Sequence, residues 1–364
     1  MKLLINKNIK LVLNYLLSLI IVLLIASILI TIQGSNPMEA ILAIVNGAIG
    51  SKAAIASSIR WSIPVIISSM AAIVAHKSGI NNLGLDGQIY FGALSAAIAG
   101  AFIQLPSFIH IIFCILVGGI FGAIFAIIPA LLKSYLKINE MVVTLMFNYI
   151  AVLLTEFITL KLMGLGASTN PDLIATPEIL ESAKLTKIMP PYQASTGIFV
   201  GLILFLLVFI FYKFTKSGYE WKMIGFNQKF AKYGGVDDNK TYFKVFLTSA
   251  FIAGICGSIE ILGPHMRFRA NFAQNLGWDG IMVALIGKNN PVATLVFSIV
   301  WGMVKAGSLS MERTTSVNRI IVTLVQALFV LFVTVDFSKM FKDIKRKISN
   351  KNKKAEDLVW WICF

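Results

Sequence analysis

The chain has 364 residues, of which 57% are hydrophobic and only 13% are charged. A soluble protein of this size needs a far more polar surface, so this composition excludes a soluble domain and indicates an all-α polytopic membrane protein. The net charge of +15 is typical of the Lys- and Arg-rich cytoplasmic loops of such proteins, so we expect a lipid bilayer and no nucleic acid as its partner. The three cysteines and three histidines are scattered, and no metal site is expected.

Apolar runs predict about ten membrane spans, of which the second and the eighth are short. In chain order they cover about 11–31, 61–75, 88–105, 108–132, 141–162, 197–212, 245–262, 281–286, 292–308 and 320–336. A cleaved signal peptide is the alternative for the first run, but this run is long for one and no A-x-A site follows it. We expect a single transmembrane domain over 1–337.

Three polar stretches lie outside the predicted spans. The stretch 163–196 holds four prolines and is expected to be an extracellular loop, and 213–244 is the most charged internal segment, with seven lysines. A basic tail follows over 338–364 and ends in the apolar run LVWWICF. With ten crossings, most of the 32 Lys and Arg residues lie on the side of the two termini, so both termini and 213–244 are predicted to be cytoplasmic.

The hexapeptide NLGLDG at Asn82–Gly87 recurs as NLGWDG at Asn275–Gly280. Five predicted crossings separate the copies, which places them on opposite sides of the membrane, as in an inverted-topology repeat whose broken or short helices flank a substrate path. Glycines at Gly84, Gly87, Gly277 and Gly280 permit close backbone approach. The acceptors Asn82, Asp86, Asn275 and Asp279 are suited to capping the helix that follows each copy, and Trp278 to anchoring at the membrane interface.

Polar residues within membrane spans cost free energy when they are placed in the bilayer, so we expect them to have a function. Thr144 and Asn148 are spaced i,i+4 and share one helix face, where Asn148 is a candidate either for substrate binding or for interhelical hydrogen bonding. Glu260 and Lys305 are further charges within spans, and we expect them to pair with each other or to extend to an interface.

Four blocks resemble the bacterial ABC importer permeases for nucleosides and simple sugars. They are GINNLGLDGQIYFGA (79–93), NEMVVTLMFNYIA (139–151), GYEWKMIGFNQKFAKYGGV (218–236) and GWDGIMVALIGKNNP (277–291). The NGAIGS and TLMFNY segments favour the nucleoside branch over the ribose branch. Asp86 stands where the family pattern has Glu, which keeps the charge, and Lys222 stands where it has Arg.

The resemblance implies a type II ABC importer permease fold and several partners. These are a cytoplasmic ABC ATPase, a second permease subunit, expected to be a paralogue that forms a heterodimer with this chain, and an extracellular lipoprotein or periplasmic binding protein. It also implies that a short coupling helix within 218–236 docks on the ATPase. The residues assigned to coupling are Gly218, Glu220, Gly225, Asn227, Ala231 and Gly235. An anionic-lipid contact of this basic segment is the alternative.

No P-loop pattern occurs in the chain, so we expect neither a bound cofactor nor catalysis here, and ATP is expected on the partner. The predicted function is the permease subunit of an ATP-driven nucleoside importer in the bacterial plasma membrane. The residues assigned to the substrate path are Asn81, Asn82, Gln88, Asn148 and Asn289. The alternatives are an ABC permease for a simple sugar such as ribose, and an ion-coupled carrier that uses Glu156 and Glu260 as proton sites.

Overall fold

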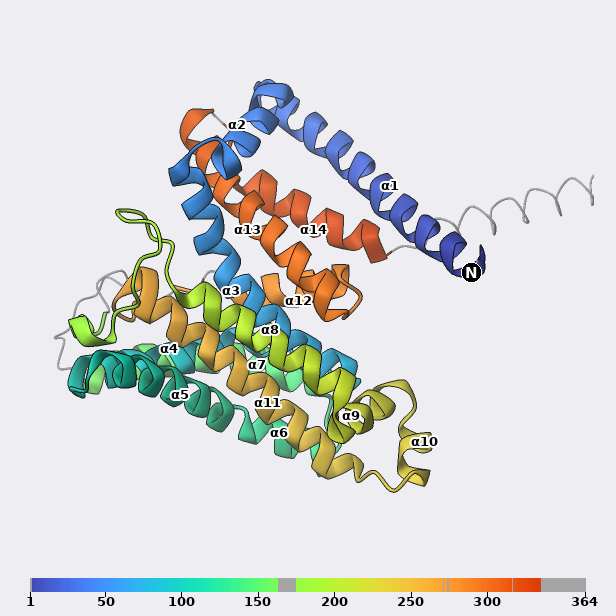
Figure 1. Ribbon diagram of the computed structural model, residues 1–364, viewed down its shortest axis with the longest axis vertical. Coiled ribbons are helices and arrows are strands. Elements are labelled where there is room, and N and C mark those ends of the chain that lie inside the picture. The colour runs from blue at the N-terminus through green and yellow to red at the C-terminus, as the bar shows by residue number, and fades with distance from the viewer. Residues whose placement is uncertain (1, 163–174, 271, 274, 316, 335–364) are drawn as a thin grey trace, which may run out of the picture. The chain divides into compact units, whose positions relative to one another are not determined.

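The computed structural model describes residues 2–162, 175–270, 272–273, 275–315 and 317–334, and within these residues the regular structure is helical apart from two isolated β-bridges. The predicted tail 338–364 and the first part of the loop 163–196 lie outside the described residues. The helices are α1 (Lys2–Ile32), α2 (Pro37–Ile49), α3 (Lys52–Lys77), α4 (Leu85–Phe102), α5 (Ser107–Phe125), α6 (Ile127–Ser134), α7 (Glu140–Leu162), η2 (Glu181–Ala183), α8 (Gly197–Phe214), α9 (Lys216–Phe226), α10 (Gln228–Tyr233), α11 (Asp238–Glu260), η3 (Ile261–His265), α12 (Leu276–Ile286), α13 (Pro291–Thr314) and α14 (Ile320–Thr334) (Figure 1).

The chain forms two compact units. The first comprises residues 1–40 and 315–364, and in it α1 packs along α14. The second comprises residues 41–314, and in it α3 contacts α8, α11, α12 and α13, while α4, α5 and α11 pack together (Figure 1). The prediction of a single domain over 1–337 stays a prediction.

Each of the ten predicted spans corresponds to a helix, and the all-helical membrane fold is confirmed. Seven helical segments of the described residues are long and apolar enough to cross a membrane, and α2, α12 and α14 are shorter apolar helices. The fourth span is divided at Ala126 into α5 and α6. Pro129 lies in the first turn of α6, where its missing N–H breaks no helical hydrogen bond.

The stretch before the second span differs from the prediction. Helix α2 was not expected, and α3 begins at Lys52 rather than Trp61, with the side chain of Ser51 accepting a hydrogen bond from the Ala54 N–H. Two of the polar residues that shortened the predicted span have partners inside the fold. Ser58 donates to the carbonyl of Ala48, and Arg60 forms an ion pair with a residue of α11.

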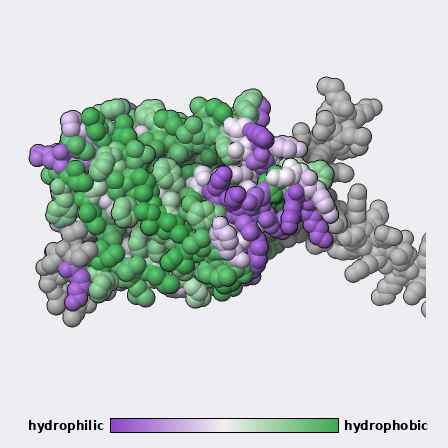
Figure 2. Space-filling view, turned by 90° about the horizontal axis from the view of Figure 1, so that it is seen from below, coloured by the Kyte–Doolittle hydropathy of each residue, from purple (hydrophilic) through white to green (hydrophobic). Residues whose placement is uncertain are grey.

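Burial separates the helices of the second unit into inner and outer ones. In the apolar windows of α3 and α11, 89% and 83% of the residues are buried, against 17% in α7 and 22% in α8. The outer helices expose large apolar side chains, and Figure 2 shows a surface that is mostly hydrophobic, with one large group of hydrophilic side chains beside the hydrophobic area. Such an apolar exterior is suited to lipid contact.

Three helices of the second unit meet at glycines. A Cβ added to Gly254 of α11 would lie 2.2 Å from the carbonyl oxygen of Gly118 in α5, and one added to Gly92 of α4 would lie 2.4 Å from the carbonyl oxygen of Gly254. Small residues allow helices to approach this closely in a membrane. The contact fixes α4 against the interior helix α11 and so positions the start of α4.

Candidate functional site

The two copies of the hexapeptide meet in space. Each copy begins after an inner helix has ended and runs into the first turn of the next helix, which is α4 for 82–87 and α12 for 275–280. The backbone N–H of Gly277, in the first turn of α12, donates to Oδ1 of Asp86 at 2.7 Å. A Cβ on Gly277 would lie 2.6 Å from the backbone nitrogen of Asp86, so only glycine fits at this approach. Asp86 is therefore held by the free N–H of the opposite helix, where negative charge is favoured.

The capping expected within each copy is not what the structure shows. Helix α4 is capped by Gly84 without a side-chain bond, and Asn82 accepts from the Gly84 N–H before the helix begins. Asn275 occupies the N-cap position of α12 in a left-handed conformation, with φ of 66°, and its side chain makes no capping bond. Asp279 pairs with Lys305 of α13 instead. The repeat thus joins two helix starts to each other.

Asn82 and Gln88 bind each other. The amide of Asn82 donates to Gln88 Oε1 at 3.0 Å, and that of Gln88 donates back to Asn82 Oδ1 at 3.2 Å. Asn82 also donates to the hydroxyl of Ser249 in α11 at 3.1 Å, and both amide side chains are only 1% exposed. This buried network ties the α3–α4 connection to the core. The assignment of these two residues to the substrate path stays a prediction.

Thr144 and Asn148 lie on one face of α7, as predicted from their spacing, and both contact the first hexapeptide. Asn148 accepts from the Gly87 N–H and donates to the carbonyl of Leu83, both at 2.8 Å, while Thr144 accepts from the Leu83 N–H at 3.2 Å. These bonds satisfy backbone groups where the chain enters α4. The amide of Asn148 therefore joins α7 to α4, which is the interhelical role.

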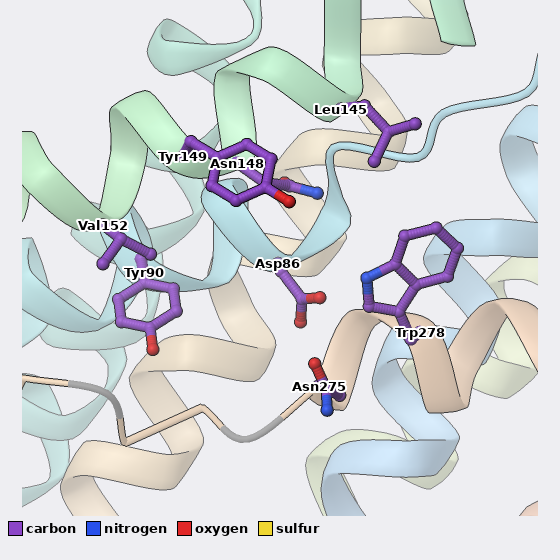
Figure 3. A pocket seen from close by; sticks show the side chains of 8 residues that line it. All are labelled: Asp86, Tyr90, Leu145, Asn148, Tyr149, Val152, Asn275 and Trp278. Carbon is purple, nitrogen blue, oxygen red and sulfur yellow. The ribbon is translucent and has the colours of Figure 1, made fainter. Parts of the chain in front are cut away.

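A cavity of about 380 Å³ opens beside this junction. Its lining residues come from α4, α7 and α12 and are Asp86, Tyr90, Leu145, Asn148, Tyr149, Val152, Asn275 and Trp278 (Figure 3). A volume in this range is ordinary for a small-molecule site, and aromatic walls with a few polar groups are the usual lining. The space lies between the two helix starts that the repeat forms.

Of the five residues predicted for the substrate path, Asn148 lines this cavity. Asn81 is half-buried in the connection before α4, and Asn289 lies in the turn between α12 and α13. Trp278, expected at the membrane interface, is half-buried in the cavity wall. The sequence reasoning missed Tyr90 and Tyr149. Helical spacing of i,i+4 from Asp86 places Tyr90 on the same face, whereas Tyr149 directly follows Asn148 and has no such signal.

Buried charges pair differently from the prediction. Glu260 forms an ion pair with Arg60 of α3 at 3.0 Å, and His265 lies 3.4 Å from the same carboxylate oxygen. The Arg60 guanidinium also stacks over Trp61, 3.9 Å from the ring centre. Lys305 instead pairs with Asp279, so the expected pairing of Glu260 with Lys305 is wrong.

The indole N–H of Trp301 donates to Oδ1 of Asp279 at 3.1 Å. Asp279 is thus held by two groups of α13, the indole and the Lys305 ammonium. Because Asp279 lies in the first turn of α12, these contacts fix the start of the short helix that bears Trp278. The position of one cavity wall therefore depends on this ion pair.

The predicted coupling segment holds two short helices, α9 and α10, where one was expected. The side chains of Thr215 and Asn227 accept from the N–H groups of Gly218 and Phe230 and cap them, and Gly235 follows α10 with φ of 81°. A depression of about 220 Å³ lies between the two helices, lined by Lys216, Tyr219, Glu220, Met223, Phe230, Ala231, Gly234 and Val236.

Two glycines position α9 against the membrane helices. A Cβ on Gly218 would lie 2.1 Å from the carbonyl oxygen of Phe211 in α8, and one on Gly225 would lie 2.1 Å from that of Lys77 at the end of α3. The contact at Gly225 connects α9 with the helix that leads into the first hexapeptide. The backbone of α9 is therefore in direct contact with the end of α3.

The segment ends at Asp237, which caps α11. The backbone N–H of Lys240 donates to this carboxylate at 3.1 Å, and the bond holds the pKa of Asp237 below its usual range.

Comparison with known proteins matches residues 54–334 to the family described as branched-chain amino acid transport system / permease component. The guanosine ABC transporter permease protein NupP of Bacillus subtilis is 29% identical over 93% of this chain and 97% of its own length. The nucleoside ABC transporter permease protein NupB of Lactococcus lactis is 24% identical over 91% and 93% of the two chains. The glucose ABC transporter permease protein TsgB13 of Haloferax volcanii is 26% identical over 77% and 76%. Because the family model matches most of the chain, the protein belongs to this family of ABC transporter permeases, as a multi-pass membrane subunit for transport rather than an enzyme.

Proposed function

We propose that this chain is the permease subunit of an ATP-driven importer that moves nucleosides into the cell. The observation that carries the proposal is the cavity between the two hexapeptides, which combines the aromatic rings of Tyr149 and Trp278 with the polar groups of Asp86 and Asn275. A nucleoside has a flat base that stacks on aromatic rings and a sugar that forms hydrogen bonds, so it is complementary to such a lining.

The relatives support the same substrate class. NupP is named for guanosine and NupB for nucleosides, and both align over nearly the whole of this chain. The relative named for glucose favours a simple sugar as the second candidate, since a sugar also forms hydrogen bonds with polar side chains.

The transport cycle requires partners. We place an ABC ATPase at α9 and α10 on the cytoplasmic side, with both termini on that side of the bacterial plasma membrane. A second permease subunit and a substrate-binding protein on the outer side complete the importer. ATP binding and hydrolysis in the partner would move α9, and the backbone contact between Gly225 and the end of α3 would pass this movement to the first hexapeptide.

A competition uptake assay tests the substrate. Cells that express the transporter are given labelled guanosine with an excess of unlabelled guanosine, adenosine, uridine or ribose. We expect the nucleosides to compete and ribose to have little effect. Uptake of labelled ribose without uptake of labelled guanosine would support the sugar candidate instead.

The energy source is tested in membrane vesicles. We expect uptake to stop when internal ATP is depleted and to continue in the presence of a proton ionophore. The opposite result would assign the protein to the ion-coupled carriers.

A further inference from the structure

The two carboxylate oxygens of Asp86 differ in their hydrogen bonding. Oδ1 accepts the Gly277 N–H at 2.7 Å, whereas Oδ2 has no hydrogen-bond partner among the described residues. Asp86 also lines the cavity, and Figure 3 shows its carboxylate directed into the space between α7 and α12. The protein therefore holds a carboxylate in one orientation and leaves one acceptor facing the cavity.

The equivalent residue of the second copy is used differently. Both oxygens of Asp279 have protein partners, since Oδ1 accepts from Trp301 and Oδ2 from Lys305. Asp279 is 4% exposed and is not among the residues that line the cavity. Of the two acidic residues in the repeat, Asp86 is the one placed to meet a substrate.

We propose that Oδ2 of Asp86 accepts a hydrogen bond from a ring hydroxyl of the transported substrate. A carboxylate is only an acceptor when ionised, so its partner must be a donor such as a hydroxyl. The aromatic rings of Trp278 and Tyr149 are suited to the base of a nucleoside, which leaves the sugar for Asp86. A free sugar offers the same hydroxyl chemistry.

The inference rests on the cavity used for the proposed function, but it predicts a separate property. Asp86 distinguishes substrates that carry the hydroxyl from analogues that lack it. A site that hydrogen-bonds a hydroxyl rejects the analogue without it, because the buried acceptor is then left unpaired.

The test compares maximal uptake rates in cells that carry the complete transporter with variants of this chain. The probes are guanosine and 2′,3′-dideoxyguanosine, with ribose and 2-deoxyribose as a second pair. Saturating concentrations fill the binding protein with either compound, so the ratio of rates reports passage through the permease.

The main variant is Asp86→Asn. The amide oxygen can still accept from the Gly277 N–H, so the start of α12 is kept, while an NH2 donor replaces the free oxygen. We expect the ratio of the guanosine rate to the dideoxyguanosine rate to fall about tenfold, because the NH2 group can form only a neutral hydrogen bond with the hydroxyl in place of the charge-assisted one. Asp86→Glu keeps a carboxylate and should restore part of the ratio.

Glu181→Gln is the matched control, because Glu181 is exposed on η2 and makes the same acid-to-amide change outside the cavity. It should leave the ratio at the wild-type value. If Asp86→Asn also leaves the ratio unchanged while guanosine is still transported, the role of Asp86 is overturned and the proposed function stands. If wild type transports only ribose, and Asp86→Asn lowers the ratio of ribose to 2-deoxyribose, the nucleoside function fails and the role of Asp86 holds.

Discussion

The ion pair between Asp279 and Lys305 should contribute strongly to the stability of the folded chain. Lys305→Met removes the ammonium and leaves a carboxylate whose side chain is 6% exposed, with only the indole N–H of Trp301 as a donor. Removal of one partner of a buried pair costs about 3–5 kcal/mol in free energy of unfolding. Since Lys305 is 19% exposed and the indole bond remains, we expect about 3 kcal/mol.

The reverse change should cost less. Asp279→Asn leaves the Lys305 ammonium 5.2 Å from the centre of the Trp61 ring, where a cation–π contact offsets part of the loss. We expect about 2 kcal/mol for this variant. The double variant, Lys305→Met with Asp279→Asn, has no unpaired charge. It should therefore lower the free energy of unfolding by less than Lys305→Met alone does.

The assay is a double-mutant cycle on the unfolding of the purified full chain in detergent. Lys229→Met, at an exposed position of α10, is the control for loss of a lysine and should change stability by less than about 0.5 kcal/mol. If the costs of the two single variants simply add in the double variant, the two side chains do not form a buried ion pair.

Asn148→Leu removes the bonds to the Gly87 N–H and the Leu83 carbonyl, so it should destabilise the chain by about 2–4 kcal/mol in the same unfolding assay. Gly225→Leu should leave membrane insertion intact, because α9 lies outside the predicted spans. It should abolish uptake while ATP hydrolysis by the complex continues. Normal uptake by this variant would exclude the contact at Gly225 from coupling. Asp237 has a lowered pKa in the folded chain, so its capping contributes stability above its unfolded pKa of about 3.9 and loses it as the pH falls through the folded value. The difference in thermal stability between wild type and Asp237→Ala should therefore shrink below about pH 4, and a difference that stays constant would contradict the capping role.

The helices were largely predictable because each membrane span must be an apolar run of limited length. The run 197–212 predicted α8, which covers Gly197–Phe214. The first half of α3 was not predictable, because Arg60 interrupts the apolar pattern and its partner Glu260 lies far along the chain. A local pattern reports the cost of burying a charge and contains no information about a distant counterion.

The cavity was predictable only in part, because a local pattern shows which residues share a helix face but not what that face contacts. The spacing of Thr144 and Asn148 identified the inward face of α7, but not whether the amide of Asn148 would face a substrate or the backbone. That choice depends on how the connection before α4 lies against α7, where the N–H of Gly87 comes within 2.8 Å of Asn148. Tyr149 is 66% exposed and lies beside Asn148, so its place in the cavity wall follows only from the position of α12 opposite it.

The acidic residues of the two hexapeptide copies have different partners in the fold. Each copy supplies an acidic residue in the first turn of a helix, yet Asp86 holds the N–H of Gly277 in the other copy, whereas Asp279 binds Trp301 and Lys305 of α13. Two carboxylates facing one cavity would repel each other at close range, since like charges disfavour joint ionisation. The pairing of Asp279 with Lys305 offsets part of that repulsion, and Asp86 is the acceptor that faces the cavity. The ion pair with α13 is therefore expected to support both the position of α12 and the charge state of the cavity.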